Sequence, residues 1–502
     1  MKTTISELMT RSGVAFGTSG ARGLATAITD RVSYAYTVGF LQYLEKTRQI
    51  QGSKAHVALA GDLRPSTGRI MEAVTRAIED KDHLPVHCGR IPSPALALFG
   101  LVEQIATIMV TGSHIPDDRN GIKFNKPTGE ILKSDERGMA AQEVDLPDHL
   151  FDADGRFTRE SNSMRIVNAR ALSNYTERYR DFFGRDALRG LRVGVYQHSA
   201  VGRDMLVEIL TEAGATTLTL GRSDVFIPVD TEAIRPEDVQ LAKEWAQQHQ
   251  LDAIVSADGD SDRPLVSDET GGWLRGDVAG ILCANFLEAD CVCTPVSCNT
   301  AVEKCGWFKQ VRRTRIGSPY VIEAMNQAAA TGAKRVVGYE ANGGFLINSD
   351  IELGGRKLRA LPTRDAVIVI LSILTLARQK NQSVRALAGS LPQRFTASDR
   401  LKNFPTEKST AILARFKSGS DETDRRAIES VFAGLCGQVT GVDRTDGQRF
   451  TFKNAEVIHL RPSGNAPEFR CYSEAATDER AKVINSQALK IVSSLAEERQ
   501  KR

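Results

Sequence analysis

The chain has 502 residues, of which 41% are hydrophobic and 25% are charged, an ordinary composition for a globular enzyme. At about 100–200 residues per domain, this length predicts three to five domains, each with a core of its own. The 65 Lys and Arg against 62 Asp and Glu give a formal net charge of only +3. No basic run with interleaved aromatics occurs, so the sequence predicts no nucleic-acid partner.

The first residues lack the apolar core of a secretory signal. The longest apolar stretch, 366–377, is flanked by Asp365 and Arg378. It is too short for a membrane helix, which needs about 20 residues, and it predicts a buried helix and no membrane partner. The eight cysteines include no C-x-x-C pair. They predict buried, reduced thiols rather than a zinc site, and the expected compartment is the cytoplasm.

Three segments follow one pattern, in which a short apolar strand leads through a polar turn into a helix. They begin at His56, Leu191 and Cys291. Their turns end in residues that favour the start of a helix. The pattern predicts three related α/β domains, in which strands and helices alternate around a mixed sheet.

Four other apolar strands end in loops rich in glycine and polar groups: Thr111–Pro116, Asp258–Arg263, Gly338–Gly344 and Arg461–Pro467. Ligands of α/β proteins gather where such loops leave the carboxyl ends of strands, so the sequence predicts four domains around a central cleft. The expected domains are 1–155, 165–270, 271–385 and 390–502. The last lacks the strand–turn–helix unit and is expected to be a distinct α+β domain ending in a long helix from about Asp478.

The loop after the strand LDAIVSA carries Asp258, Asp260 and Asp262. Three carboxylates at this spacing repel one another without a cation, and a hard divalent ion such as Mg²⁺ is their natural partner. A calcium loop of the EF-hand type fits less well, because Arg263 and Pro264 stand at its positions 6 and 7. A solvated acidic turn is the remaining alternative.

Ser113 is a candidate nucleophile or phosphate carrier if a cation lies beside it, and a capping serine otherwise. His114 has either a catalytic or a structural role, and the basic residues Arg119 and Lys123 follow it.

The loop near the C-terminus offers a guanidinium, a hydroxyl and an amide from Arg461, Ser463 and Asn465, with Arg470 close behind. This set suits an oxyanion, although a simple turn is an equal alternative. Glu340 and Asn342 pair an acceptor with an amide, which suits two hydroxyls of a sugar.

Taken together, these segments resemble the α-D-phosphohexomutase family, which includes phosphomannomutase and phosphoglucomutase. The resemblance runs from Phe16 to Arg470, with the family's motifs in the family's order: Phe16–Gly23, Thr111–Pro116, Asp258–Arg263, Glu340–Gly344 and Arg461–Pro467. It implies four domains around a cleft and transfer of phosphate between the 6- and 1-positions of a hexose. Phosphorylated Ser113 and a bisphosphorylated sugar are the implied intermediates.

The resemblance also implies roles for single residues. Mg²⁺ is held by a Ser113 phosphate oxygen and the three aspartates, and a hexose 1,6-bisphosphate is the activator. Besides Ser113 and His114, the catalytic set includes Arg22, Lys123 and Arg263. These three are similar to family residues that contact the reacting phosphate or assist proton transfer. Arg461, Ser463 and Asn465 hold the phosphate that does not react.

Several positions depart from the family pattern. Gly112 and Ile115 stand in a loop that usually reads T-A-S-H-N-P. Asn342 and Gly344 replace the serine and histidine of the sugar loop, so no acid/base role is carried over to position 344. Arg315 stands where a lysine is expected and is predicted to replace it as a phosphate or sugar contact.

The sequence therefore predicts a phosphomannomutase with phosphoglucomutase activity as a second capacity. Glucose and mannose differ at C2, whereas the sugar loop is expected to contact O3 and O4. The alternatives are a phosphoglucosamine mutase, a non-catalytic phosphosugar-binding protein and a metal-dependent phosphatase. The phosphohexose is the expected partner of a chain that acts as a monomer or dimer.

Overall fold

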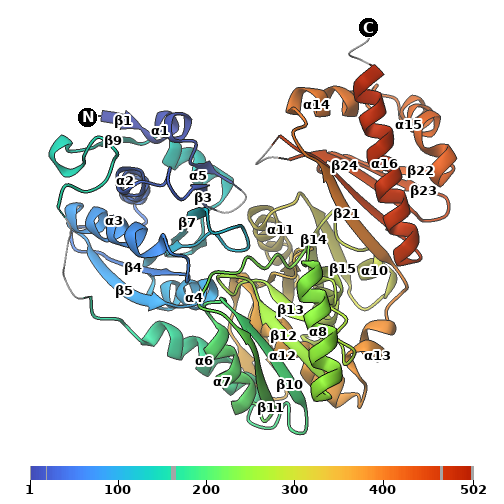
Figure 1. Cartoon of the computed structure of the whole chain (residues 1–502), viewed down its shortest axis with the longest axis horizontal. Coiled ribbons are helices and arrows are strands. Elements are labelled where there is room, and N and C mark those ends of the chain that lie inside the picture. Colours follow the sequence, from blue (N-terminus) through green and yellow to red (C-terminus); the bar gives the residue numbers. More distant parts are fainter. Residues whose placement is uncertain (1, 18–19, 160–164, 464–466, 499–502) are drawn as a thin grey trace.

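The computed structural model describes residues 2–17, 20–159, 165–463 and 467–498. The chain forms four successive bodies, which we call domains 1 to 4 after the four main sheets that they carry (Figure 1). Domains 1 and 4 lie at opposite ends of the view, and domains 2 and 3 join them. The predicted fold class, three mixed-sheet α/β domains followed by a distinct fourth, is confirmed.

Domain 1 has a sheet in the order β2-β3-β7-β6-β4-β5. Its elements are β1 (Lys2–Thr4), α1 (Ile5–Ser12), β2 (Ala15–Phe16), β3 (Ala21–Leu24), α2 (Asp30–Lys46), β4 (His56–Gly61), α3 (Thr67–Asp80), β5 (Leu84–Arg90), α4 (Ser93–Glu103), β6 (Ala106–Val110), β7 (Arg119–Lys126), β8 (Gly129–Glu130), α5 (Lys133–Ala140), β9 (Glu143–Asp145) and the 3-10 turn Asp148–Leu150.

Domains 2 and 3 repeat this plan with shorter sheets, in the orders β11-β10-β12-β13 and β15-β14-β16-β17-β20. The elements of domain 2 are α6 (Arg170–Phe183), β10 (Arg192–His198), α7 (Arg203–Glu212), β11 (Thr216–Arg222), α8 (Pro236–His249), β12 (Ala253–Ala257) and β13 (Pro264–Val266). Those of domain 3 are α9 (Gly276–Phe286), β14 (Cys291–Pro295), α10 (Ala301–Lys304), β15 (Gln310–Thr314), α11 (Ser318–Ala330), β16 (Val336–Tyr339), β17 (Phe345–Ile347), β18 (Ile351–Leu353), β19 (Arg356–Leu358), β20 (Leu361–Asp365), α12 (Ala366–Gln379) and α13 (Val384–Gly389).

The three related sheets place their functional loops at equivalent positions. In each, a central strand (β4, β10 or β14) is parallel to both neighbours, and the next strand (β6, β12 or β16) pairs with an antiparallel one (β7, β13 or β17). The turn between the last two strands carries Ser113 in domain 1, the three aspartates in domain 2 and Glu340 in domain 3. One local geometry therefore presents three different chemical groups.

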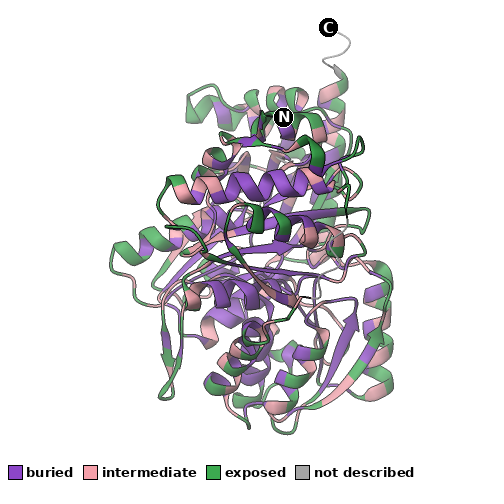
Figure 2. Ribbon diagram, turned by 90° about the vertical axis from the view of Figure 1, so that its left-hand side faces the viewer, coloured by how far each residue is buried: buried purple, intermediate pink, exposed green. Residues whose placement is uncertain are grey.

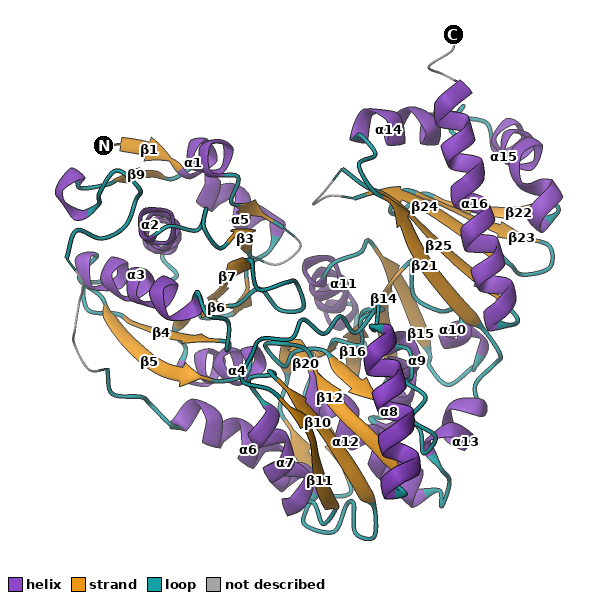
Figure 3. Cartoon of the chain, in the orientation of Figure 1, coloured by secondary structure: helices purple, strands orange, loops and turns teal. Residues whose placement is uncertain are grey.

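Domain 4 is built differently, from an antiparallel sheet in the order β21-β25-β24-β23-β22. Its elements are β21 (Phe395–Leu401), α14 (Thr406–Ala414), α15 (Asp421–Cys436), β22 (Val439–Asp443), β23 (Gln448–Phe452), β24 (Val457–Pro462), β25 (Phe469–Ala475) and α16 (Asp478–Glu498). The long helix α16, predicted from about Asp478, crosses this sheet (Figure 3). Domain 4 has its own apolar core, separate from the others.

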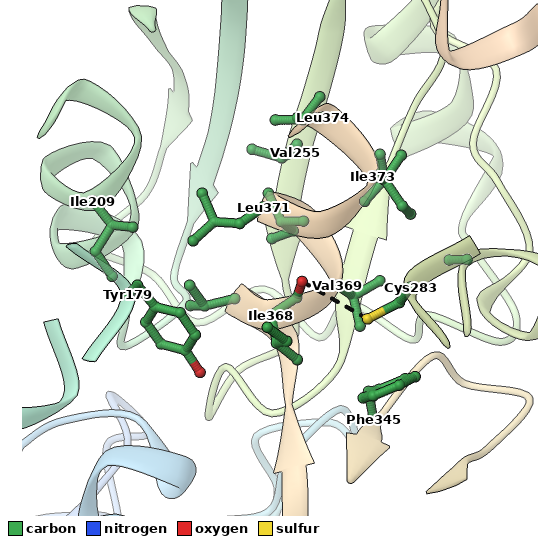
Figure 4. Packing of buried hydrophobic residues seen from close by; sticks show 14 of the residues in the cluster. Tyr179, Ile209, Val255, Cys283, Phe345, Ile368, Val369, Leu371, Ile373 and Leu374 are labelled. Carbon is green, nitrogen blue, oxygen red and sulfur yellow. Dashed lines mark hydrogen bonds between the residues drawn. The ribbon is translucent and has the colours of Figure 1, made fainter. Parts of the chain in front are cut away.

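One apolar core joins domains 2 and 3 with the face of domain 1 that carries α4, and helix α12 lies within it. The predicted buried stretch is confirmed, because every residue from Ala366 to Ala377 is buried. Figure 4 shows Ile368, Val369 and Leu371 among side chains from domains 2 and 3, including Ile209 and Phe345. Buried residues are concentrated in the sheets and in the helix faces toward them (Figure 2).

Hydrogen bonds to a capping aspartate hold the N-terminus of α12 in place. The Asp365 carboxylate accepts hydrogen bonds from Val367 N (3.0 Å) and from the Tyr175 hydroxyl (2.7 Å). The end of β20, just before this cap, is therefore held in place at the N-terminus of α12.

None of the described helices combines the length and the apolar character that crossing a bilayer requires. The eight cysteines are free thiols, and all but the half-buried Cys305 are buried.

Candidate active site

Ser113 lies at the boundary between domains 1 and 2. Its buried Oγ donates a hydrogen bond to Asp258 Oδ2 at 2.6 Å, so two loops separated by 145 residues meet at one atom pair. The backbone at Ser113 has φ of 56°, a left-handed conformation that serine rarely adopts. The surrounding contacts therefore fix the direction in which this hydroxyl points.

Arg64, a residue that the sequence analysis did not single out, supports the Ser113 loop. Its guanidinium donates to the carbonyl oxygens of Ser113 (2.8 Å), Ile115 (2.5 Å), Pro116 (2.6 Å) and Arg119 (3.1 Å). It also lies 4.1 Å from the ring centre of Phe226 in domain 2, a cation–π contact. One buried arginine thus fixes the loop and ties it to the next domain.

Gly112, one of the departures from the family pattern, has a physical reason in this arrangement. A Cβ on Gly112 would lie 2.6 Å from Arg64 Cζ and 2.7 Å from its Nε. These distances are shorter than any van der Waals contact. The alanine expected from the family pattern and this position of Arg64 exclude each other.

We expect Gly112→Ala to displace Arg64 and to lower stability by about 1–3 kcal/mol, as overpacking of a fixed core does. Turnover should fall as well, because the carbonyls that Arg64 holds belong to the Ser113 loop. Urea unfolding and kcat measure the two effects. Gly434→Ala in α15 is the matched control, since nothing lies within 4 Å of its Cβ position. Equal stability of the two variants would contradict the overpacking.

The three aspartates are buried together at the end of β12. Asp258 and Asp260 have no exposed surface and Asp262 is 2% exposed, so the alternative of a solvated acidic turn is wrong. One oxygen of each carboxylate lies within 4.8 Å of the others. Asp258 Oδ1 accepts from the backbone N–H groups of Asp262 and Arg263, both at 3.1 Å.

The donor set suits a cation. Asp260 Oδ1 and Asp262 Oδ1 are buried and accept no hydrogen bond from any described residue. A buried carboxylate oxygen without a donor is unfavourable, and a divalent ion with oxygen ligands is the usual remedy. Burial and the charges of Asp260 and Asp262 raise the pKa of Asp258 to about 8.

The predicted basic residues surround the trio. Lys123 Nζ, on β7, donates to Asp260 Oδ2 (2.6 Å) and Asp262 Oδ2 (2.7 Å). Arg263 Nε lies 3.6 Å from Asp262 Oδ1 and 3.8 Å from Asp258 Oδ2. Arg22 lies on β3, opposite Gly121 of β7. Burial and the charges of Arg263 and a further arginine, Arg364, lower the pKa of Arg22 to about 10, which places three guanidinium groups in one region.

His114 accepts a hydrogen bond rather than offering a free base to Ser113. Arg263 Nη1 lies 2.9 Å from His114 Nδ1. Because arginine only donates, Nδ1 is the acceptor and the ring proton is on Nε2. Ser113 Oγ is farther from the same nitrogen, at 3.4 Å. Burial, then the charges of Arg263 and Arg22, hold the pKa of His114 well below its usual value, so the ring is neutral.

The loop Gly338–Gly344, the predicted sugar loop, is joined through Arg364 to the loop Asp258–Arg263, the predicted metal loop. Glu340 is buried and accepts from Arg364 Nη1 at 3.1 Å. Asn342 accepts from Gly344 N at 2.9 Å through its side-chain oxygen, which fixes the orientation of the amide within its own loop. Arg315 is exposed, and its guanidinium lies 4.9 Å from the Tyr320 ring centre.

The loop Arg461–Pro467 of domain 4, the predicted phosphate loop, connects β24 and β25. Ser463 is buried, and its N–H donates to Glu468 O at 2.8 Å. The predicted contact Asn465 lies outside the described residues. Arg461 lies directly opposite Arg470 on the neighbouring strand, and Arg470 lies opposite Arg400 on β21.

This row of three arginines places like charges side by side across adjacent strands, which is destabilising without anions. Asp446 lies 3.5 Å from Arg461 Nε, and Glu468 lies 3.2 Å from Arg400 Nε and 3.3 Å from Arg470 Nη2. Glu232 of domain 2 also acts on Arg470 through its charge. Guanidinium groups side by side suit the bidentate recognition of a phosphate group. The sequence analysis missed Arg400, since only the strand register brings it to the row.

A cavity of about 320 Å³ connects the two halves of the site. It is lined by His114 of domain 1, Asp230, Glu232 and Arg263 of domain 2, and Arg400 and Arg470 of domain 4. This volume fits a small ligand. His114 and Arg263, the neighbours of Ser113 and of the aspartates, line one side, and Arg400 and Arg470 of the arginine row line the other.

The chain matches known protein families over most of its length. Residues 13–145, 173–272 and 275–395 match the alpha/beta/alpha domains I, II and III of phosphoglucomutase/phosphomannomutase, and residues 405–491 match the C-terminal domain. A phosphomannomutase of Salmonella muenchen is 42% identical over 475 residues, 95% of each chain. A phosphomannomutase of Sinorhizobium fredii is 42% identical over 484 residues, 96% of this chain and 99% of its own.

A solved structure, a putative phosphomannomutase from Thermus thermophilus, has the same fold, with a TM-score of 0.70 at 18% identity over 96% of this chain and 99% of its own. The chain belongs to the phosphoglucomutase/phosphomannomutase family. It is therefore an enzyme, an intramolecular phosphotransferase that acts on hexose phosphates.

Proposed function

We propose that this enzyme interconverts mannose 6-phosphate and mannose 1-phosphate, with glucose phosphates as second substrates, by way of a phosphate carried on Ser113. The observation that supports this proposal best is the 2.6 Å contact between Ser113 Oγ and the buried aspartate trio of another domain. The 42% identity to two phosphomannomutases favours mannose.

The proposed chemistry consists of two phosphoryl transfers. In the first, the bond between Ser113 Oγ and phosphorus breaks while the free hydroxyl of the sugar phosphate forms a bond to the same phosphorus. The sugar hydroxyl loses the proton that Ser113 Oγ gains. The hexose 1,6-bisphosphate so formed turns over within the cavity, and its other phosphate returns to Ser113 by the reverse chemistry. Added hexose 1,6-bisphosphate would then act as activator by phosphorylating Ser113.

The residues of the chain contribute position and charge. Arg64 and Thr111 hold the Ser113 backbone, through Ser113 O at 2.8 Å and Ser113 N at 2.8 Å. Arg22 and Arg263 supply positive charge for a transferring group with dispersed negative charge. Arg461 and Ser463, together with Asn465, would hold the phosphate that does not react, and Glu340 and Asn342 the sugar hydroxyls.

Asp258, Asp260 and Asp262 would hold Mg²⁺ together with a Ser113 phosphate oxygen. Bound there, Mg²⁺ supplies charge neutralisation for the transferring phosphoryl group. The eight free cysteines suit a reducing compartment, and we place the enzyme in the cytoplasm.

The metal site predicts a pH-dependent stability. The raised pKa of Asp258, about 8, means that the metal-free folded protein keeps a proton that the unfolded chain releases near pH 4. The folded state thus binds more protons between these values, and stability without metal should fall as the pH rises from about 5 to about 8.

Mg²⁺ requires the ionised carboxylate, so its stabilising effect should grow over the same range. Thermal unfolding at about pH 5 and about pH 8, with EDTA or with Mg²⁺, measures both effects. An increase in Tm by Mg²⁺ that is equal at both pH values would contradict the raised pKa.

The proposal is tested by comparing three substrates side by side: mannose 1-phosphate, glucose 1-phosphate and glucosamine 1-phosphate, each with its 1,6-bisphosphate. We expect kcat/KM for mannose and glucose within about tenfold of each other, because a single C2 hydroxyl outside the expected contacts changes binding little. Preference for glucosamine would support a phosphoglucosamine mutase instead. Release of inorganic phosphate would indicate a phosphatase, and binding without conversion a non-catalytic protein.

A further inference from the structure

Arg364 lies where domains 1, 2 and 3 meet, in none of the loops that the sequence analysis selected. It is at the end of β20, directly before the residue that caps α12, and only 2% of it is exposed. Its Nε donates to Asp262 Oδ2 at 3.1 Å, and its Nη1 donates to Glu340 Oε2 at 3.1 Å. A single guanidinium therefore connects the metal loop with the sugar loop.

A further contact extends this link to domain 1. Arg364 Nη1 also donates to Ser318 Oγ at 3.3 Å, and Ser318 in turn donates to Glu130 Oε2 at 3.1 Å. Thr363 donates to the other oxygen of the same carboxylate, at 2.5 Å. Glu130 belongs to the β7–β8 hairpin of domain 1. The position of Arg364 thus depends on all three α/β domains.

The methylene groups of Arg364 occupy the space above Gly344. A Cβ on Gly344 would lie 2.5 Å from Arg364 Cδ and 2.6 Å from its Cγ. These atoms are in the middle of a side chain that is pinned at both ends, so they have little freedom to move. The observed position of the Arg364 side chain therefore requires a glycine at position 344.

The charge of Arg364 is well compensated. Burial disfavours the charged guanidinium, yet Asp262, Glu340 and Glu130 hold the pKa of Arg364 above its usual value. Its planar fork reaches two carboxylates on different loops at once, which a lysine ammonium does less well.

We propose that Arg364 is a positioning residue with two effects: it holds Glu340 in place for the sugar, and it reduces the negative potential of the aspartate trio. The first effect rests on the proposed function, in which Glu340 contacts the sugar. The second is independent of the sugar.

Arg364→Met should separate these effects, because they act in opposite directions. Without the guanidinium, Glu340 loses its anchor, and the Kd for mannose 6-phosphate should rise about five- to a hundredfold, in line with the usual coupling between contacting residues. Loss of a neighbouring cation should make Mg²⁺ bind about tenfold more tightly, by Coulomb's law. Calorimetry with each ligand on the full-length protein measures both. Arg364→Lys should recover part of the mannose 6-phosphate affinity.

Two double-mutant cycles test the proposed contacts. In the Glu340→Gln background, Arg364→Met should have little further effect on mannose 6-phosphate binding. Gly344→Ala should weaken that binding in the parent protein, because it displaces Arg364, but should be tolerated in the Arg364→Ala background, where the space is free. Additive effects in both cycles would overturn the proposal.

Arg313→Met is the matched control. Arg313 is a half-buried arginine of the same domain that donates to Glu303 and to the carbonyls of Pro295 and Cys298, which belong to neither loop. If Arg364→Met weakened Mg²⁺ and mannose 6-phosphate binding together, as general damage to the fold would, or left both unchanged, the proposal would be wrong. These measurements need binding but no turnover. A parent protein that binds mannose 6-phosphate without converting it would therefore refute the proposed function and leave the proposal for Arg364 open to the same test. A parent protein that does not bind mannose 6-phosphate would refute the proposed function before any variant is compared.

Discussion

Ser113→Ala is expected to lower kcat for the conversion of mannose 1-phosphate by at least about 10⁴-fold, the usual scale for loss of a nucleophile. Ser113 Oγ donates directly to Asp258 Oδ2 at 2.6 Å, and no other hydroxyl of the described residues donates to this carboxylate. The fold should survive, since the loop is held through backbone atoms by Arg64 and Thr111. Mass spectrometry after incubation with glucose 1,6-bisphosphate should find one added phosphate on the parent protein and none on the variant.

The comparison needs a serine that is equally buried but remote from the cleft. Ser372, a fully buried residue of α12, meets this requirement. Ser372→Ala should retain both phosphorylation and turnover. Unchanged turnover in Ser113→Ala would mean that the phosphate travels on another group, whereas a lowered Tm in that variant alone would point to misfolding rather than to lost chemistry.

Local patterns were sufficient for much of this protein. The three strand–turn–helix units predicted the three α/β domains because alternation of apolar strand, polar turn and helix is a property of neighbouring residues. The spacing of Asp258, Asp260 and Asp262 after an apolar strand likewise predicted a cation site from nearby residues alone. The family resemblance supplied the order of the loops, which single motifs do not specify.

The parts that the sequence analysis missed depend on contacts between distant residues. Arg64 acts on carbonyl oxygens 49 to 55 residues away, and backbone carbonyls leave no signature in a sequence. Arg364 meets Asp262 across 102 residues, and no motif around it in the sequence marks this contact. Gly112 and Gly344 had no explanation in the sequence, because the arginines that fill the space beside them come from other segments.

Asp260→Asn is expected to lower kcat by about 10²–10⁴-fold while the Kd for mannose 6-phosphate changes little. Asp260 Oδ2 accepts from Lys123 Nζ (2.6 Å) and Ser93 Oγ (2.5 Å), and Oδ1 is the oxygen without a hydrogen bond from any described residue. An asparagine must place its NH₂ group at one of these two positions. If the NH₂ group faced Lys123 and Ser93, it would meet two other hydrogen-bond donors. If it took the place of Oδ1, it would replace a metal ligand with a group that repels the cation.

Either orientation weakens the metal site, so the loss should be greatest at low Mg²⁺ and partly reversed at high Mg²⁺. A series of kcat measurements at increasing Mg²⁺ concentration therefore distinguishes a metal defect from a general one. Asp204→Asn, which changes a surface aspartate of the same domain paired with Arg222, should follow the parent curve. A loss of activity in Asp260→Asn that is the same at every Mg²⁺ concentration would indicate that this carboxylate serves to hold Lys123 rather than the cation.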